Sequence, residues 1–323
     1  MRIKKRIISV LTVAFSAMML TACGSKTTGK IKYHFADRKE AVECYLANDE
    51  YLSGFSKCEL QYKLNNKNGT IEELKEYGAS QMLEYSDEEK EAIKKLIQDM
   101  ETDLAKNKYT LPPTDEIVLI KSTQNEEGGS GAYTHKTHIY FGDYWIEGLT
   151  SDDPKEKIWA KQTMWHELFH CLTRNNPDFR KKMYSIIHFT INDKDFEIPP
   201  AVYEKYISNP DVEHHNSYAS FNINGEMKDC YTALIALKPY ENVDDNFFDC
   251  MGTALVPIDG SNTFYLPEDA SNFWDVFGEN TEYVIDPEEC MAENFSYAMT
   301  YGLDGAEYKN PEIIEAILEI VSN

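Results

Sequence analysis

Hydrophobic residues spaced three and four positions apart predict helices in the first third of the chain. The clearest helix begins after Ser86-Asp87-Glu88-Glu89, where a serine N-cap and an acidic residue three positions later form a capping box. Apolar residues then follow at helical spacing: Ala92, Ile93, Leu96, Ile97, Met100 and Leu104. Another helix is predicted over residues 37–48. Residues 31–110 contain no motif with recognisable chemistry, and we interpret them as an N-terminal helical region.

After Pro112-Pro113 the pattern changes to short apolar runs. Ile117-Val118-Leu119-Ile120 is rich in β-branched residues, and residues 134–141 alternate in polarity, so both runs are predicted to be strands. Residues 253–257 and 263–266 flank a turn sequence and predict a hairpin.

Three helix-start signals follow in this second region, residues 111–323. Asp153-Pro154 supplies an N-cap and a first-turn proline, and the helix that it opens is expected to run to about Arg174. Asp286-Pro287 and Asn310-Pro311 open two more helices. We therefore predict an α+β fold that is mainly helical, with a small sheet just before the central helix.

The first 22 residues are typical of a signal peptide. Basic residues between positions 2 and 6 precede an apolar run over 7–20, which is shorter than the roughly 20 residues that span a bilayer. Leu20-Thr21-Ala22-Cys23 resembles a bacterial lipobox, in which the cysteine accepts a lipid. Residues 23–30 are then a lipidated tether, which holds the protein at the cell membrane facing the exterior. The alternative is an ordinary secretory signal in which Cys23 is incidental.

The formal net charge of the 323-residue chain is −23, which excludes nucleic acid as a partner because phosphates would be repelled. An exported protein can form disulfides. Besides Cys23 there are six cysteines, for which Cys44–Cys58 and Cys230–Cys250 are the local pairings expected first. The alternative is that all six are unpaired core residues.

The predicted central helix contains the sequence His166-Glu167-Leu168-Phe169-His170. Residues four apart lie on one helical face, so both imidazoles can reach a single ion. Zinc accepts imidazole nitrogen and, with three protein ligands, leaves one position open. Glu167 follows the first histidine and can take a proton from water beside the ion. This spacing predicts a site for one zinc ion, with Glu167 as general base.

The third ligand must come from elsewhere in the chain. Glu289 and Glu293, on the helix opened by Asp286-Pro287, are four apart and face the same way. One of them can bind the ion while the other holds a ligand imidazole by its free N–H. His214 or His215, in a polar loop, is the alternative ligand, and Glu289 can also be simple N-terminal helix charge.

The pair of segments HELFH and, about 120 residues later, EECMAENF resembles the gluzincin group of zinc peptidases. The spacing E-x-x-A-E-x-F is similar to that of the lethal-factor and Pro-Pro endopeptidase type. The resemblance implies a zincin-like catalytic domain over residues 111–323. It implies zinc ligation by His166, His170 and Glu289, general-base catalysis by Glu167, and a supporting role for Glu293.

In those relatives a tyrosine a couple of turns before the glutamate ligand stabilises the oxyanion. Here Glu282 stands at that position and Tyr283 follows it. Tyr283 is therefore the expected oxyanion donor, with Tyr218, His214 and His215 as alternatives.

The expected function is that of a membrane-anchored extracytoplasmic endopeptidase, which hydrolyses the peptide bonds of a peptide or protein substrate with zinc-activated water. The strand predicted over 134–141 either pairs with an extended substrate or simply covers the core. Two other functions are open: a zinc-containing binding lipoprotein without turnover, and a zinc amidase acting on cell-wall peptides. An intact Glu167 argues against the first, because a purely structural site needs no base.

Overall fold

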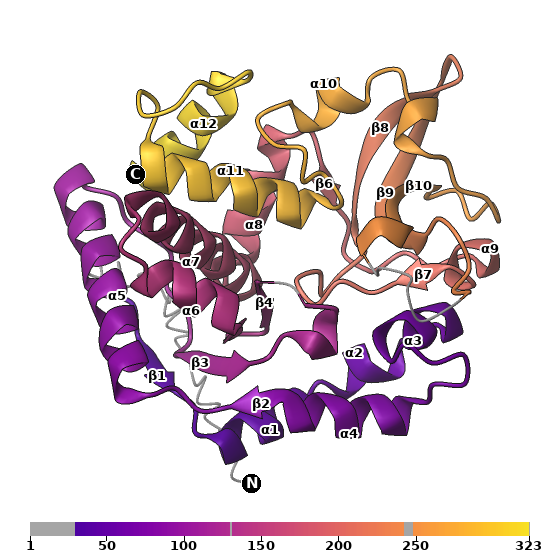
Figure 1. Cartoon of the computed structure of the whole chain (residues 1–323). Helices are drawn as coiled ribbons and strands as arrows, with labels where there is room; N and C mark the ends of the chain where they lie inside the picture. The colour runs from indigo at the N-terminus through magenta and orange to yellow at the C-terminus, as the bar shows by residue number, and fades with distance from the viewer. Residues whose placement is uncertain (1–29, 130, 242–247, 323) are drawn as a thin grey trace, which may run out of the picture.

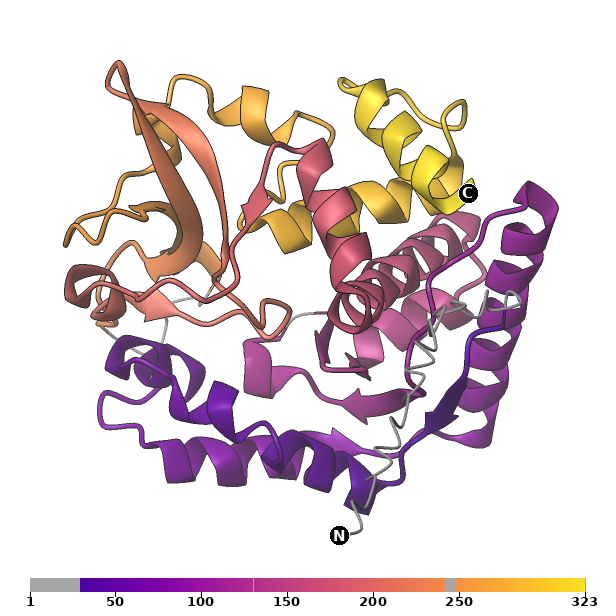
Figure 2. The ribbon, with the colours of Figure 1, turned by 180° about the vertical axis from the view of Figure 1, so that it is seen from behind.

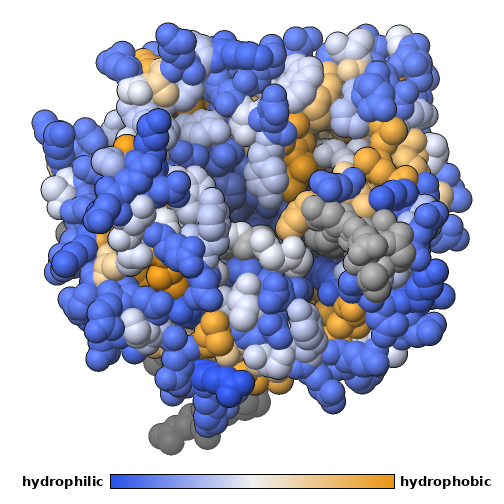
Figure 3. Space-filling model, viewed as in Figure 1, coloured by the Kyte–Doolittle hydropathy of each residue, from blue (hydrophilic) through white to orange (hydrophobic). Residues whose placement is uncertain are grey.

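The computed structural model describes residues 30–129, 131–241 and 248–322. The predicted signal peptide and Cys23 lie outside these residues. No helix in the described ranges is both long and apolar enough to cross a membrane. Hydrophilic side chains cover most of the face shown in Figure 3, and hydrophobic ones gather there only in small patches.

The fold is α+β, with two sheets embedded among helices (Figure 1). The first sheet has the strand order β1-β3-β5-β4, with β2 paired to β3. Its strands are β1 (Tyr33–Phe35), β2 (Met82–Leu83), β3 (Ile117–Ser122), β4 (Ala132–His135) and β5 (His138–Phe141). Strand β4 is the last in this order, and it pairs antiparallel with β5.

Helices cover both faces of this sheet. The N-terminal helices are α1 (Arg38–Leu46), α2 (Asp49–Ser53), α3 (Lys57–Lys63), α4 (Ile71–Gln81) and α5 (Asp87–Asn107). Val118 and Ile120 of β3 pack with α1 and α4, whereas Ile117 and Leu119 face the main core. Strands β1 and β2 come from the N-terminal region, so both regions of the chain contribute to one sheet.

The main core lies between this sheet and the helices of the second region. Those helices are α6 (Asp143–Thr150), α7 (Pro154–Asn175), α8 (Pro177–Ile186), α9 (Pro200–Tyr203), α10 (Phe273–Phe277), α11 (Pro287–Tyr301) and α12 (Pro311–Ser322). Helix α7 lies over the sheet, and α11 packs on its far side (Figure 1).

The second sheet stands beside α8 and α11, on the side away from α5 (Figure 2). Its order is β10-β9-β8-β6, with β7 paired to β9. The strands are β6 (Thr190–Ile191), β7 (Tyr206–Ile207), β8 (Ser217–Ile223), β9 (Glu226–Ala236) and β10 (Met251–Pro257). Short 3₁₀ turns occur at η1 (Asn125–Glu127), η2 (Phe248–Cys250) and η3 (Pro267–Asp269).

The helix-start signals in the sequence are confirmed. Ser86 accepts a hydrogen bond from Glu89 N while the Glu89 side chain accepts from Ser86 N, which completes the predicted capping box of α5. Asp153 caps α7 and Asp286 caps α11, each followed by a first-turn proline. These local hydrogen bonds satisfy helix N–H groups that would otherwise have no partner.

Two strand predictions and the disulfides need correction. Residues 134–141 are not one strand but the end of β4, a turn and β5, because Lys136 adopts a left-handed φ of 54° that reverses the chain. In the hairpin predicted over 253–266, the second run forms only a bridge between Leu255 and Tyr265. Neither predicted disulfide is formed: all six described cysteines are free, and four of them are buried.

Candidate metal centre

Helices α7 and α11 bring His166, His170 and Glu289 together. Helix α7 is buried around most of its second half, including Trp165, Leu168 and Phe169, which fixes the face that the two imidazoles present. Helix α11 is equally buried and packs along α7. Because Glu289 lies in the first turn of α11, its carboxylate is placed opposite both imidazoles.

The geometry of these three side chains suits one ion. One nitrogen from each imidazole and one oxygen of Glu289 lie within 4.8 Å of one another. Glu289 Oε2 is 3.0 Å from His166 Nε2 and 3.7 Å from His170 Nε2. Ligand atoms 2.0–2.1 Å from a tetrahedral zinc ion would lie roughly 3.3 Å apart. These three side chains can therefore hold a metal ion.

The burial of the His170 imidazole and its unpartnered Nε2 atom support this conclusion. His170 is fully buried, and its Nε2 atom has no hydrogen-bond partner. A buried polar atom without a partner costs free energy, so such an atom calls for a ligand. Nε2 is the atom that faces Glu289, and a cation there would satisfy it. The donor set of two imidazoles and one carboxylate is one that zinc accepts.

Carboxylates hold the other nitrogen of each imidazole. Glu293 Oε2 lies 3.2 Å from His166 Nδ1, the supporting position predicted for it. Glu288 Oε1 lies 3.0 Å from His170 Nδ1, and Thr173 and Tyr184 also donate to this buried carboxylate. Such contacts fix the imidazole orientation and leave Nε2 free for an ion.

Hydrogen bonds and neighbouring charges shift the pKa values of His166 and Glu289. Burial alone would lower the pKa of His166, but its hydrogen bonds to Glu289 and Glu293 outweigh burial and raise the pKa well above its usual value. Burial would raise the pKa of Glu289, but the His166 hydrogen bond and the charge of His170 lower it to about 2. Glu289 is therefore a carboxylate at neutral pH, ready to bind a cation.

We expect Glu288→Gln to weaken zinc binding by about 10–100-fold, the usual cost of removing the carboxylate that holds a ligand imidazole. Titration of metal-free protein with zinc against a chelator of known affinity measures the change. Glu282→Gln, the same substitution at an exposed position nearby, is the control and should bind zinc like the wild type. Equal affinities for the two variants would contradict a supporting role for Glu288.

Glu167 points toward the first sheet. Its Oε2 accepts a hydrogen bond from the Thr134 hydroxyl of β4 at 2.7 Å. Burial raises the pKa of Glu167, while the charges of the two histidines and the Thr134 hydrogen bond act in the opposite direction. A buried carboxyl group is thus fixed beside the two imidazoles, at the position expected for the general base.

Tyr283 reaches the centre although it stands one residue after the expected position. Its hydroxyl lies 3.4 Å from Glu289 Oε1, and its ring centroid is 6.2 Å from that of His166. The residue as a whole is 43% exposed, but burial of its hydroxyl raises the pKa of Tyr283 well above the usual value, so the hydroxyl lies inside the centre.

The alternative residues lie elsewhere. His214 is exposed and pairs with Asp195, His215 binds the Tyr206 hydroxyl, and Tyr218 packs on Phe196. None of these three belongs to the groups of described residues able to hold an ion.

Besides Glu288, sequence reasoning missed two residues of the centre, Asn209 and Asp211. Both lie between β7 and β8, far from α7 and α11 in the chain. Asn209 donates to Glu289 Oε1 at 2.5 Å, and Asp211 Oδ1 lies 3.9 Å from His170 Nε2. Glu167, His170 and Asp211 form a second group that could hold a metal ion, and it shares His170 with the first. The only signal in the sequence was their position just before the His214-His215 loop.

No protein-family model, curated protein or solved structure matches this chain.

Proposed function

We propose that this chain is a membrane-anchored extracytoplasmic zinc endopeptidase with a zincin-like catalytic domain of the gluzincin type. The observation that carries the proposal is the convergence of His166, His170 and Glu289, with Glu167 alongside and a buried His170 Nε2 that lacks a partner. A structural ion would not require Glu167, a buried carboxyl group held by Thr134 next to the ligands.

Each side chain has a role in this proposal. His166, His170 and Glu289 would hold the zinc ion, which supplies a Lewis acid for a carbonyl oxygen and lowers the pKa of water. Glu167 takes a proton from the attacking water and passes it to the leaving amine. Thr134 keeps the Glu167 carboxyl oriented. Tyr283, whose hydroxyl lies beside Glu289, donates a hydrogen bond to the developing oxyanion.

The substrate of this proposal is an extended peptide that lies along β4. Strand β4 is terminal in its sheet, and Thr134, the residue of β4 that binds Glu167, brings that edge next to the base. A peptide added to a sheet edge gains main-chain hydrogen bonds whatever its sequence, which suits an endopeptidase.

A digest of an unbiased peptide library with the purified protein tests the proposal. We expect internal peptide bonds to be cleaved when zinc is present, cleavage to stop when a chelator removes the metal, and activity to return when zinc is restored. Cleavage confined to cell-wall peptides would favour the amidase. Binding without any cleavage would favour the zinc-containing binding lipoprotein.

We expect Cys23→Ser to release the protein from the membrane or to stall removal of its leader, because the lipid would have no attachment atom. Fractionation of cells grown with labelled fatty acid measures both effects. Cys58→Ser, which leaves the leader intact, should remain membrane-bound and labelled. Equal labelling of Cys23→Ser and wild type would contradict lipidation at Cys23.

A further inference from the structure

The loop between β7 and β8, here called the 208–216 loop, covers the free edge of β4. Two main-chain N–H groups, one in β4 and one in the turn that follows it, donate to carboxyl groups of this loop. Thr134 N lies 2.6 Å from Asp211 Oδ1, and Lys136 N lies 2.9 Å from Glu213 Oε1. These amides belong to the edge along which we propose that substrate lies.

The spacing of these contacts is that of an added strand. Thr134 N of β4 and Lys136 N of the turn that follows it both point to the loop. Asp211 and Glu213 are also two residues apart, and their carboxylates stand where carbonyl oxygens of a paired peptide would accept. The loop thus satisfies the hydrogen bonds that an extended peptide would make.

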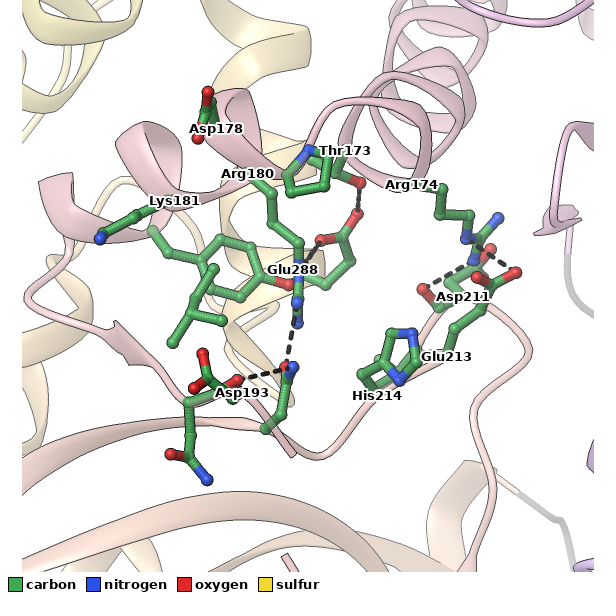
Figure 4. A pocket seen from close by; sticks show the side chains of 16 residues that line it. Thr173, Arg174, Asp178, Arg180, Lys181, Asp193, Asp211, Glu213, His214 and Glu288 are labelled. Atoms are coloured by element: carbon green, nitrogen blue, oxygen red, sulfur yellow. Dashed lines mark hydrogen bonds and ion pairs between the residues drawn. The ribbon is translucent and has the colours of Figure 1, made fainter. Parts of the chain in front are cut away.

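Arg174, at the end of α7, lies against Asp211 and Glu213 of the loop (Figure 4). Its guanidinium donates to the main-chain oxygens of Pro210 and Asp211, at 3.3 and 2.9 Å, and to that of Lys136 at 3.2 Å. It also lies 3.3 Å from the Glu213 carboxylate. One side chain of α7 therefore ties the loop to the turn that follows β4.

The same loop reaches into the metal centre. Asp211 is buried, and its carboxylate, which accepts from Thr134 N, lies 3.9 Å from the His170 nitrogen that lacks a hydrogen-bond partner. Asn209 of the loop donates to Glu289 at 2.5 Å. A buried carboxylate is stable only when paired, and a cation bound by His170 would be its natural partner.

We propose that the 208–216 loop is a built-in competitor of the substrate: Asp211 caps the metal centre while Asp211 and Glu213 occupy the edge of β4. This inference rests on the proposed peptidase function. Asp211 belongs to the second group able to hold an ion, with His170 and Glu167, so its carboxyl group stands beside the first group, where catalysis needs an open position. The loop must therefore leave both β4 and the centre before a peptide can enter, and the protein as folded is in a closed state.

Backbone amide hydrogen exchange on the metal-free full chain tests the edge contact. We expect Thr134 and Lys136 to be protected in the wild type. Asp211→Ala should speed exchange at Thr134 by roughly tenfold or more, because it removes the group that accepts the Thr134 N–H. Asp195→Ala, which removes a carboxylate bound to His214 of the same loop, is the control and should leave Thr134 protected. Wild-type exchange at the rate of free amides would overturn the proposal.

Calorimetry with acetohydroxamate, a small zinc-binding probe, tests whether Asp211 covers the metal centre of the zinc-loaded chain. We expect Asp211→Ala and Asp211→Asn to bind it roughly tenfold more tightly than wild type, since apparent affinity falls with the fraction of molecules that are closed. Asp211→Asn keeps an acceptor for Thr134 N, so it should retain amide protection and still gain affinity. Equal probe affinity in wild type and both variants would overturn the cap.

The two measurements separate this inference from the proposed function. A wild type that binds no zinc would contradict the proposed function, and exchange in metal-free protein would still decide whether the loop covers β4. The opposite outcome is a wild type that binds zinc, binds the probe as tightly as the variants do and exchanges freely at Thr134. It would support the metal centre and contradict the proposal that the loop competes with substrate.

Discussion

Glu167→Gln is expected to lower the rate of peptide cleavage by about 10²–10⁴-fold while leaving zinc content unchanged. Glutamine keeps the shape of the side chain and an oxygen that can accept the Thr134 hydroxyl, but it cannot take a proton. The measurement is kcat/KM for a cleaved library peptide, with zinc determined in the same samples. The matched control is Glu147→Gln, an exposed position on α6, which should cleave like the wild type.

This substitution also distinguishes an enzyme from a binding protein. If Glu167→Gln cleaves as fast as wild type at equal zinc content, the general-base assignment is wrong. If neither protein cleaves any peptide and both bind the same ligand equally, the binding lipoprotein is the better interpretation. Glu289→Gln should behave differently from Glu167→Gln, because it replaces a charged ligand and should reduce zinc content as well as rate.

His170→Ala should nearly abolish zinc binding, a larger loss than the roughly 10–100-fold expected for supporting residues. The substitution removes one of three ligands and also leaves the buried carboxylates of Glu288 and Asp211 without their imidazole partner. Elemental analysis after titration of metal-free protein measures the bound zinc.

His214→Ala is the matched control, since His214 is an exposed histidine that pairs with Asp195 rather than with the centre. It should bind one equivalent of zinc, as the wild type should. A His170→Ala protein that is folded and retains a full equivalent would refute the ligand assignment. Loss of zinc from His214→Ala would instead revive the histidine loop as the source of the third ligand.

Signals that act locally in the chain predicted much of the fold. Ser86, Asp153 and Asp286 each cap the helix expected from the sequence, because an N-cap acts through hydrogen bonds within one turn. The second sheet was largely missed. Its β8 and β9 are stabilised by pairing with each other and with β10, and a short strand has little preference apart from its neighbours.

The residues of the candidate centre also fall into those that local spacing predicts and those that depend on tertiary packing. His166, Glu167 and His170 share one helix, and helical spacing alone places the two histidines on one face. Glu289 and Glu293 were found because they too are four apart on a single helix. Glu288 and Asp211 could not be found in this way: the contact of Glu288 with His170 depends on how α11 packs on α7, and that of Asp211 on a loop folded against β4.

The most direct test of the central claim is to locate the ion. Diffraction data collected on either side of the zinc absorption edge, from crystals of zinc-loaded protein, would reveal zinc by its anomalous signal. We predict one peak, bounded by His166 Nε2, His170 Nε2 and a carboxylate oxygen of Glu289, at roughly 2.0–2.1 Å from each nitrogen. No peak between these three side chains, or zinc found only at other residues, would contradict the account.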